Sequence, residues 1–442
     1  MFLARLLTGF VGVSALLCAE SHPSAAQETF NRVRQKVADT VKAAPNYTCV
    51  ETIVRTRLSS GFQARGGCED SAFDMLRGTY KTAEADRIRV DVGIADNREV
   101  FSWPGEHSFV TGDITSLVSG GIISSGSFFG FLSDIFLNGH GHYFYTGNIA
   151  VNDKTLASFR YTMSRSASHF VTRTHNGREV MAYQGEFTAD PASGDLHSLT
   201  IKTKDIPQDL ASCSLNQSVT YQDITLNGKK FRVPSMVELQ SRLIDHDLAN
   251  STTRYTNCHE FLGTSTVRYS EDPKLVAASN TPTPALPAFP AKHHLKLRLS
   301  SPIDSAKAWT GDPVTATLEN TLRGKHGRLL AEKGSVLTGR LVQLTEFGSD
   351  KPYWIFGIRF ERLHTRDGDY RIALNSESPV DVPTSAHGLF RSPKFGPDAL
   401  RPRERRGVGA FRALGSHLLL DREFVTDWES IAPHAKPDSP GE

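Results

Sequence analysis

The fold is decided by residues 86–105, which read DRIRVDVGIADNREVFSWPG. Apolar and charged residues alternate over 87–92, which is the period of a half-buried β-strand. Asp96 and Asn97 favour a turn, because their side chains can bond the neighbouring backbone. The apolar character resumes at 100–103 and ends at a Pro-Gly pair. We expect two antiparallel strands joined by a tight turn.

The chain has 442 residues, too many for one ordinary core, so two or three domains are expected. Its composition, 39% hydrophobic and 22% charged, is that of a globular protein. A net charge of +2 gives no argument for a nucleic-acid partner.

Residues 1–26 are typical of a secretory signal peptide. Arg5 is the only charge before an apolar run over 6–17, and small residues at 24–26 suit cleavage before Gln27. No later stretch approaches the roughly 18 apolar residues of a membrane span. We therefore expect an exported protein, in the periplasm or associated with the outer membrane, with no transmembrane span in the mature chain.

Cys18 raises the question of a lipid anchor. A lipidation signal has a small residue before the cysteine, and Leu17 is not small, which argues against lipidation at Cys18.

Four cysteines remain after the signal: Cys49, Cys68, Cys213 and Cys258. An even number in an exported chain indicates disulfides, and three pairings are possible. We expect Cys49–Cys68 and Cys213–Cys258, because each pair flanks a segment that reads as adjacent strands. Free buried thiols are the alternative, and no C-x-x-C spacing suggests a metal site.

The first domain is predicted over 27–270 as an α+β fold with a large antiparallel sheet. It begins with an amphipathic helix over 28–43, which Pro45 ends. Strands are expected at 47–58, within 68–82, in the opening hairpin, and at 156–163, 169–174, 180–188, 196–203, 219–226, 231–239 and 252–261.

A proline-rich linker is predicted over 271–292. A smaller all-β domain follows over 293–432, with an irregular insert at 378–407, and the tail 433–442 is expected to be disordered. Its strands are expected at 295–300, 314–318, 335–344, 353–363, 370–374, 409–414 and 416–424.

Residues 113–137 interrupt the β pattern, and we expect two short helices that pack on one face of the sheet. Asp113 is a candidate cap for the first helix, and Ser124 or Ser125 for the second. The second helix carries a stripe of large apolar residues at helical spacing: Phe128, Phe131, Leu132, Ile135 and Phe136. Such a stripe is more often core than ligand site. The alternative is a lid hinged at Gly120 and Gly121.

The first domain resembles the LolA-like periplasmic carriers of lipids and lipoproteins. The resemblance lies in the exported N-terminal helix, the Asp-Arg-Ile-Arg-Val-Asp-Val strand, the Glu-Val-Phe-Ser-Trp strand and the helical insert. It implies an open β half-barrel, closed by helices, that holds acyl chains inside.

The second domain resembles the C-terminal β-barrel of TrbI/VirB10-like secretion-channel proteins. The resemblance rests on DPVTATL at 312–318, LLAEKGSVLTGRL at 329–341, IRFERL at 358–363 and RDG at 366–368. It implies a small β-barrel and a place in an envelope assembly.

Catalytic motifs are missing from the sequence. There is no G-x-S-x-G elbow, and His259-Glu260 lacks the second histidine of a zinc protease motif. His140 and His142 would share one face of a strand, where a polar edge is the commoner explanation than a metal site. We predict no cofactor, no metal and no catalytic residues.

The sequence leaves three functions open. The first is a non-enzymatic binding protein for an apolar ligand or an envelope partner protein. The others are a structural component of an envelope or secretion assembly, and a hydrolase with an unrecognised site. For the first, the candidate ligand-binding residues come from the strands and the insert: Ile88, Val90, Phe101, Trp103, Phe128, Phe131, Leu132 and Phe136.

Overall fold

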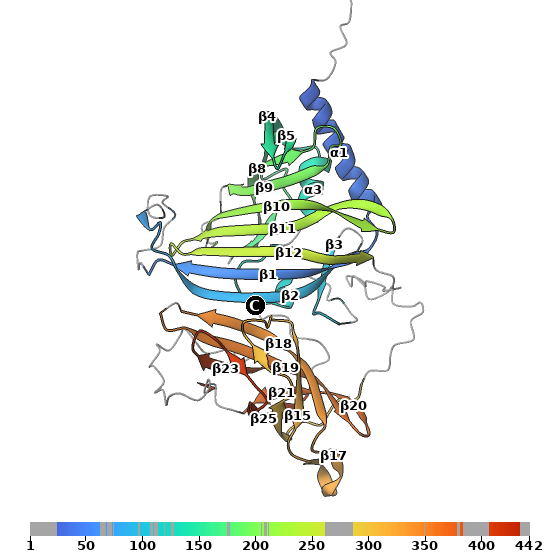
Figure 1. Cartoon of the computed structure of the whole chain (residues 1–442), viewed down its shortest axis with the longest axis vertical. Helices are drawn as coiled ribbons and strands as arrows, with labels where there is room; N and C mark the ends of the chain where they lie inside the picture. Colours follow the sequence, from blue (N-terminus) through green and yellow to red (C-terminus); the bar gives the residue numbers. More distant parts are fainter. Residues whose placement is uncertain are drawn as a thin grey trace, which may run out of the picture.

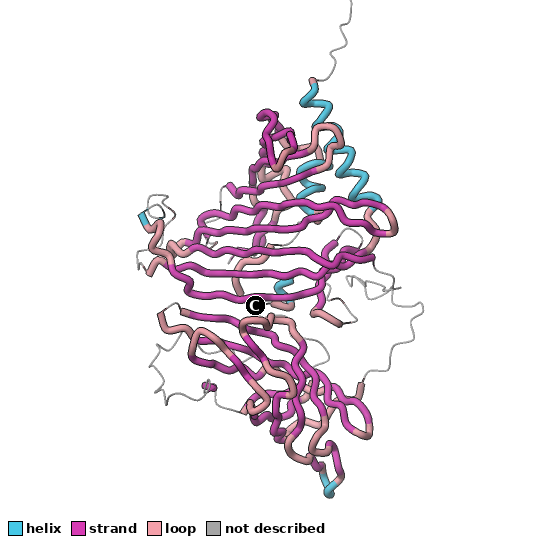
Figure 2. The backbone as a smooth tube through the Cα atoms, viewed as in Figure 1, coloured by secondary structure: helices cyan, strands magenta, loops and turns pink. Residues whose placement is uncertain are grey.

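A computed structural model describes residues 24–61, 68, 73, 75–95, 98–106, 109, 114–118, 120–124, 128–174, 177–204, 206, 210, 212–260, 286–348, 350–377, 381–382 and 406–433. Two hydrophobic cores divide this part of the chain. Buried residues of one run from Phe30 to Tyr255, and those of the other from Phe289 to Trp428. We call the parts a first domain, through residue 260, and a second domain, from residue 286 (Figure 1). Strands dominate both (Figure 2).

Helix α1 (Ala25–Ala43) opens the first domain. Ser24 caps it, because its hydroxyl accepts a hydrogen bond from the Gln27 N–H at 3.2 Å. Its apolar residues recur every three or four positions, so one stripe faces the sheet, and Phe30 and Val33 are buried there. The predicted helix is confirmed. The expected cleavage site before Gln27 lies within its first turn, and residues 1–23 lie outside the described part.

The first domain is built on one antiparallel sheet. Its strands are β1 (Tyr47–Ser59), β2 (Lys81–Ala95), β3 (Arg98–Ser102), β4 (His142–Val151), β5 (Lys154–Met163), β8 (Ala182–Ala189), β9 (Leu196–Lys204), β10 (Ser212–Leu226), β11 (Lys229–Leu243) and β12 (Leu248–Glu260). The pairings give the spatial order β4-β5-β8-β9-β10-β11-β12-β1-β2-β3. A separate hairpin joins β6 (Val171–Thr174) and β7 (Gly177–Val180).

The predicted hairpin over 86–105 is confirmed as β2 and β3, with Val92 opposite Phe101. Its turn at 96–97 lies outside the described residues. Ile88 and Val90 are fully buried, while Arg87 and Arg89, which alternate with them, are half-buried. The alternation therefore places one face of β2 in the core, as expected for this pattern.

The insert consists of η1 (Ile114–Ser116), α3 (Gly130–Leu132) and the π-helical turn η2 (Ser133–Leu137). The second predicted helix is present as the continuous segment α3–η2, but the first is a single 3₁₀ turn. Ser124 does not cap α3, whose N-cap is Phe129. Its hydroxyl donates to the side chain of Gln217 at 2.9 Å. The other proposed caps, Asp113 and Ser125, lie outside the described residues.

We call the face of the first-domain sheet that packs against α1 and the insert its inner face. Phe30 of α1 lies 5.9 Å from Phe159 of β5 and 6.3 Å from Phe187 of β8, between ring centroids. Phe136 of the insert lies 5.0 Å from the same Phe187 ring. Aromatic side chains from the helix, the insert and the sheet thus form one continuous core.

The second domain is all β apart from the short turn η3 (Lys325–Gly327). Its strands are β13 (His294–Leu299), β14 (Ile303–Asp304), β15 (Pro313–Leu318), β16 (Leu322–Arg323), β17 (Leu329–Ala331), β18 (Val336–Phe347), β19 (Tyr353–Thr365), β20 (Gly368–Arg371), β21 (Ala373–Ser376), β22 (Asp381–Val382), β23 (Gly409–Leu414), β24 (Leu419–Leu420) and β25 (Val425–Ile431). The pairings lead from β18 to β19 and β20, and from β21 through β25, β13 and β15 back to β18. Ile372 lies between β20 and β21, and its N–H donates to the Glu361 carbonyl of β19 at 3.0 Å. Phe289, inside the range predicted as a linker, is buried in this core.

The edge of β2 joins the two domains. Residues 84–86 pair with 345–347 of β18. Further along the same edge, the Arg89 N–H donates to the Thr310 carbonyl at 2.8 Å, and the Thr310 N–H donates to the Arg87 carbonyl at 2.8 Å. The strands of both domains therefore belong to one hydrogen-bonded sheet. The second domain and β3 together cover the edge that β2 would otherwise expose.

The predicted disulfides are wrong. The structure contains Cys49–Cys258 and Cys68–Cys213, with Cα–Cα distances of 4.0 and 5.3 Å. The prediction assumed that cysteines close in sequence lie on neighbouring strands. Instead β12, the last strand of the domain, pairs with β1, the first, and Thr48 lies opposite His259. Cys49 therefore meets Cys258, and Cys68 is left to bond to Cys213 in β10.

Two strand predictions also fail, and one strand was missed. A separate strand was expected within 68–82. Residues 76–79 form turns instead, and the described residues of this range hold no strand before β2 begins at Lys81. β4 is absent from the predicted strands, because most of its side chains are exposed and give no clear alternation. Near the C-terminus, 421–424 is a turn, and the long strand is β25.

Candidate functional site

The candidate site is the inner face of β1, β2 and β12 together with the insert that covers it. Residues of β1 at 47, 49, 51, 53 and 55 share this face, because alternate residues of a strand point the same way. Ile53 lies opposite Ile88 of β2, and Glu51 lies opposite Val90. Register with β12 places Tyr255 opposite Glu51. The inner face thus mixes apolar side chains with a carboxyl group.

The structure places all of the predicted ligand-binding residues in the first core, where each is buried: Ile88, Val90, Phe101, Trp103, Phe128, Phe131, Leu132 and Phe136. Their neighbours differ, however. The rings of Phe131 and Phe170 lie 5.3 Å apart between centroids. Trp103 lies toward the second domain, with the Arg340 guanidinium 5.8 Å from its ring centroid. The set therefore spans the core without forming one compact group.

Phe128 is the insert residue that lies over the centre of the site. Its ring centroid is 6.0 Å from that of Tyr47 and 4.8 Å from that of Tyr255. Its backbone N–H donates to a carboxylate oxygen of Glu99 at 3.3 Å. Phe128 therefore covers the part of the sheet where Glu51 lies, since Glu51 is opposite Tyr255.

Arg55 connects the insert to the sheet. Its guanidinium forms an ion pair with Asp86, with Nε donating to Oδ1 at 2.8 Å, and it also donates to the Gly120 carbonyl. Both charged side chains are about nine-tenths buried, with 9% exposure each. A Cβ at Gly121 would lie 2.8 Å from this guanidinium, so glycine permits the close approach.

Asp134 holds the other end of the insert. Its carboxylate accepts hydrogen bonds from the Tyr183 hydroxyl at 2.6 Å and from the His169 N–H at 3.1 Å. Burial, with the hydrogen bond to Asp134, raises the pKa of Tyr183 above its usual value. The insert is therefore held to the sheet by hydrogen bonds that involve side chains, at Gly120, Ser124, Phe128, Asp134 and Ile135. Among the described residues it pairs with no strand of the sheet.

Several polar groups on the inner face have no hydrogen-bond partner among the described residues. They are the hydroxyls of Tyr47, Ser251 and Thr253 and both carboxyl oxygens of Glu51. Burial, and to a lesser degree the charge of Glu99, raises the pKa of Glu51 well above its usual value. Sequence analysis missed this group. The signal was the alternation of β1, which places Glu51 between Cys49 and Ile53 on the buried face.

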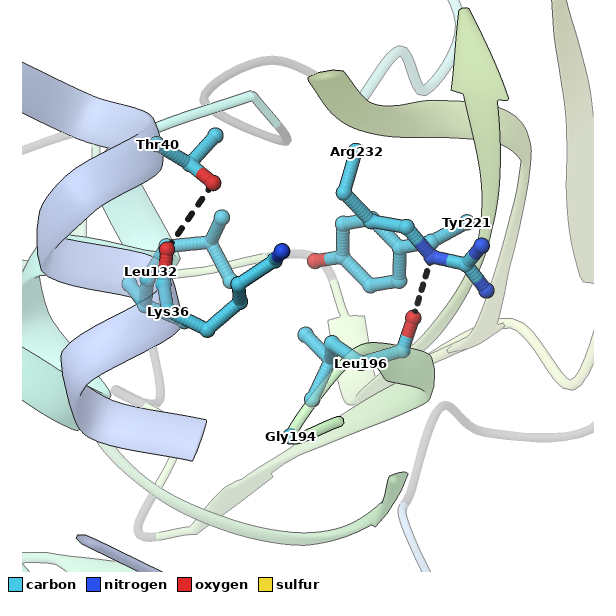
Figure 3. A pocket seen from close by; sticks show the side chains of 8 residues that line it. Lys36, Thr40, Leu132, Gly194, Leu196, Tyr221 and Arg232 are labelled. Carbon is cyan, nitrogen blue, oxygen red and sulfur yellow. Dashed lines mark hydrogen bonds between the residues drawn. The ribbon is translucent and has the colours of Figure 1, made fainter. Parts of the chain in front are cut away.

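A small cavity of about 20 Å³ lies between α1 and the sheet (Figure 3). Its polar rim is already engaged: the Thr40 hydroxyl donates to the Lys36 carbonyl at 2.9 Å, and Arg232 Nε donates to the Leu196 carbonyl at 2.7 Å (Figure 3). Burial raises the pKa of Tyr221, whose hydroxyl lines the cavity without a described partner. A volume of this size holds about one water molecule.

Within the described ranges, no three His, Cys, Asp or Glu side chains gather closely enough to hold a metal ion. None of the helices in this part of the chain combines the length and the apolar character that a membrane crossing requires. The two disulfides fit a protein of an oxidising compartment.

Comparisons with known proteins give little more. The chain matches no established protein family and no curated protein. Among solved structures, it is similar to a DUF1329 family protein from Desulfovibrio piger, over 55% of this chain and 96% of that one, with 9% sequence identity and a TM-score of 0.22. A TM-score of this size carries no argument about fold or function.

Proposed function

We propose that this chain is a non-enzymatic protein of the cell envelope that binds an apolar ligand, such as a lipid or the lipid part of a lipoprotein. The ligand would lie between the inner face of the first-domain sheet and the insert. The observation that carries the proposal is how the insert is attached. Its large apolar side chains cover the sheet, but among the described residues it is held there by hydrogen bonds that involve side chains, such as those of Arg55 and Asp134, and not by strand pairing.

Such a cover can separate from the sheet without breaking a strand pairing. The first-domain resemblance to LolA-like carriers supports the same function, since those proteins hold acyl chains inside a half-barrel closed by helices. The disulfides support export, and we place the protein in the periplasm or at the outer membrane.

The test is a titration with a fluorescent fatty-acid probe beside a thermal melt. Phe131→Asp puts a charge where the acyl chain would lie, and we expect probe binding to fall at least tenfold while the first domain still melts cooperatively. Phe144→Asp is the matched control, because Phe144 is 60% exposed on β4. It should leave both measurements unchanged.

Two outcomes would contradict the proposal. If the wild-type protein binds no apolar probe, the carrier function is wrong. The second outcome is that Phe131→Asp unfolds the domain while the Leu132→Ala variant binds the probe as wild type does. In that case the insert is ordinary core. Native mass spectrometry of the purified protein adds an independent measurement, since bound lipid would appear as added mass.

A role as a partner-binding component of an envelope assembly is the second candidate, and strand β4 favours it. β4 pairs only with β5 among the described strands, and Phe144, Tyr145 and Ile149 are exposed on it. An uncharged edge strand with exposed aromatic residues is suited to pairing with another chain. The resemblance of the second domain to TrbI/VirB10-like barrels points the same way. Cross-linking at position 144 in intact cells would identify a stable partner.

A further inference from the structure

The buried carboxyl group of Glu51 is the least explained feature of the first domain. It is 1% exposed, and neither oxygen has a hydrogen-bond partner among the described residues. An unpaired carboxyl group in a protein interior costs folding free energy, and such groups concentrate at functional sites. Nothing in the packing of β1 requires a carboxyl at this position, since its neighbours across the sheet are Val90 and Tyr255.

The groups around Glu51 form a small polar site under Phe128. Thr253 lies diagonally across from Glu51 on β12, and its hydroxyl also lacks a described partner. The Tyr47 hydroxyl is in the same condition. Tyr47 of β1 and Glu99 of β3 both lie opposite Ile94 of β2, and the Glu99 carboxylate accepts a hydrogen bond from the Phe128 N–H, so Glu99 lies on the same face beside the insert. The Phe128 ring covers this group through its contacts with Tyr47 and Tyr255.

The charges around this site favour a cation. Glu51 and Glu99 both carry carboxyl groups. Arg55, a cation on the same face of β1, already pairs with Asp86 and the Gly120 carbonyl. An anionic head group would meet two carboxyls. An ammonium group has three N–H donors and no acceptor, which matches a carboxylate with neighbouring hydroxyl oxygens.

We propose that Glu51, with Tyr47 and Thr253, binds the protonated amine of an amphiphile, and that the apolar chain of this ligand takes the place of Phe128 against the sheet. This inference rests on the proposed apolar-ligand function and specifies the head group. Binding makes one ion pair: Glu51 releases its proton to solvent and the carboxylate accepts hydrogen bonds from the ammonium group, while no covalent bond changes. Because burial raises the pKa of Glu51 well above its usual value in the free protein, forming this ion pair should release up to about one proton.

The test compares three probes with the same chain: decylammonium, its N-acetylated form and decanoate. Calorimetric titration of the full-length protein in two buffers of different ionisation enthalpy measures affinity and proton release together. We expect wild type to bind decylammonium at least about tenfold more tightly than either other probe, because hydrogen bonds to charged groups contribute on that scale. Close to one proton should be released per amine bound.

Glu51→Gln keeps the size of the side chain and removes its charge. In this variant, decylammonium should bind no better than N-acetyl-decylamine, and proton release should disappear. Glu238→Gln is the matched control, because Glu238 is exposed on the opposite face of the same sheet. It should behave as wild type does.

Each result decides between the two proposals. If all three probes bind with equal affinity, or decanoate binds best, the head-group assignment is wrong while the apolar-ligand function stands. If amine binding releases no proton, Glu51 is not the partner of the amine. If none of the probes binds, both proposals fail.

Discussion

At the scale of single residues, the buried ion pair of Arg55 and Asp86 lies where the sheet contacts the insert at Gly120. Both side chains are 9% exposed. Arg55→Met leaves Asp86 buried without a counter-charge, so we expect the free energy of unfolding to fall by about 3–5 kcal/mol. Arg160→Met is the control, because its pair with Glu186 is more than half exposed and such pairs contribute about 1 kcal/mol or less. Urea unfolding measures both, and equal losses would show that the buried pair has no special role.

Glu51 should also make stability depend on pH. Its pKa in the folded protein is raised, so as pH rises the unfolded chain loses this proton first. The free energy of unfolding then falls above the ordinary glutamate pKa of about 4.3, by at most about 1.4 kcal/mol per pH unit. Glu51→Gln lacks this loss, so its stability relative to wild type should increase between pH 4 and pH 7. A constant difference over that range, or the same increase in Glu238→Gln, would contradict this expectation.

At the scale of elements, the sequence predicted what repeats locally. The alternation in β2 and the three-four spacing in α1 identified both elements and their buried faces, because side-chain direction follows from period alone. Which strands lie next to each other could not be predicted in this way. Pairing of β1 with β12 joins residues about two hundred positions apart, and nothing local in either strand specifies it.

The candidate site shows the same contrast between features set by local sequence and features set by distant parts of the chain. Ile88, Val90 and Phe128 were predicted from their apolar spacing and are buried as that spacing requires. Glu51 was missed, because a carboxyl in an alternating strand normally indicates the solvent face. Its internal position is evident only in the folded domain, where β2, β12 and the insert lie against it.

The disulfide pairing tests the predicted arrangement of the strands. Peptide mapping without reduction should recover Cys49 linked to Cys258 and Cys68 linked to Cys213. Because each closes a long loop, of 209 and 145 positions, the chain-entropy relation gives a stabilisation of about 5 kcal/mol each as an upper value. Cys49→Ala with Cys258→Ala should therefore lower the urea midpoint markedly. Recovery of Cys49 linked to Cys68 would mean that β1 and β12 are not neighbours.

At the scale of the whole molecule, Gly311 is a point of close approach between the domains. Its φ is +106°, and a Cβ there would lie 2.2 Å from the Arg89 carbonyl oxygen. Arg87 and Arg89 stack on Trp309 beside it, at 5.1 and 5.0 Å from the ring centroid. Gly311→Ala should therefore separate the second domain from β2. We expect calorimetry to show two transitions in the variant where wild type shows one.

The control is Gly368→Ala, at the turn between β19 and β20. Its φ is +137°, so the backbone strain is comparable, but no atom lies within 4 Å of the added Cβ. This variant should lower the melting temperature and keep a single transition. Two transitions in both variants would mean that the strain, and not the contact between domains, is responsible.

The edge of β2 has a further consequence, in the order in which the domains fold. Thr310 and 345–347, the segments that cover part of this edge, come far later in the chain than β2, and domains generally fold as units. If the first domain folds before the second, this part of its edge is open to pairing with other chains. Charged residues on an edge discourage such pairing. Arg87 and Arg89 suit both stages, because they place charge along the open edge and later stack on Trp309 of the second domain.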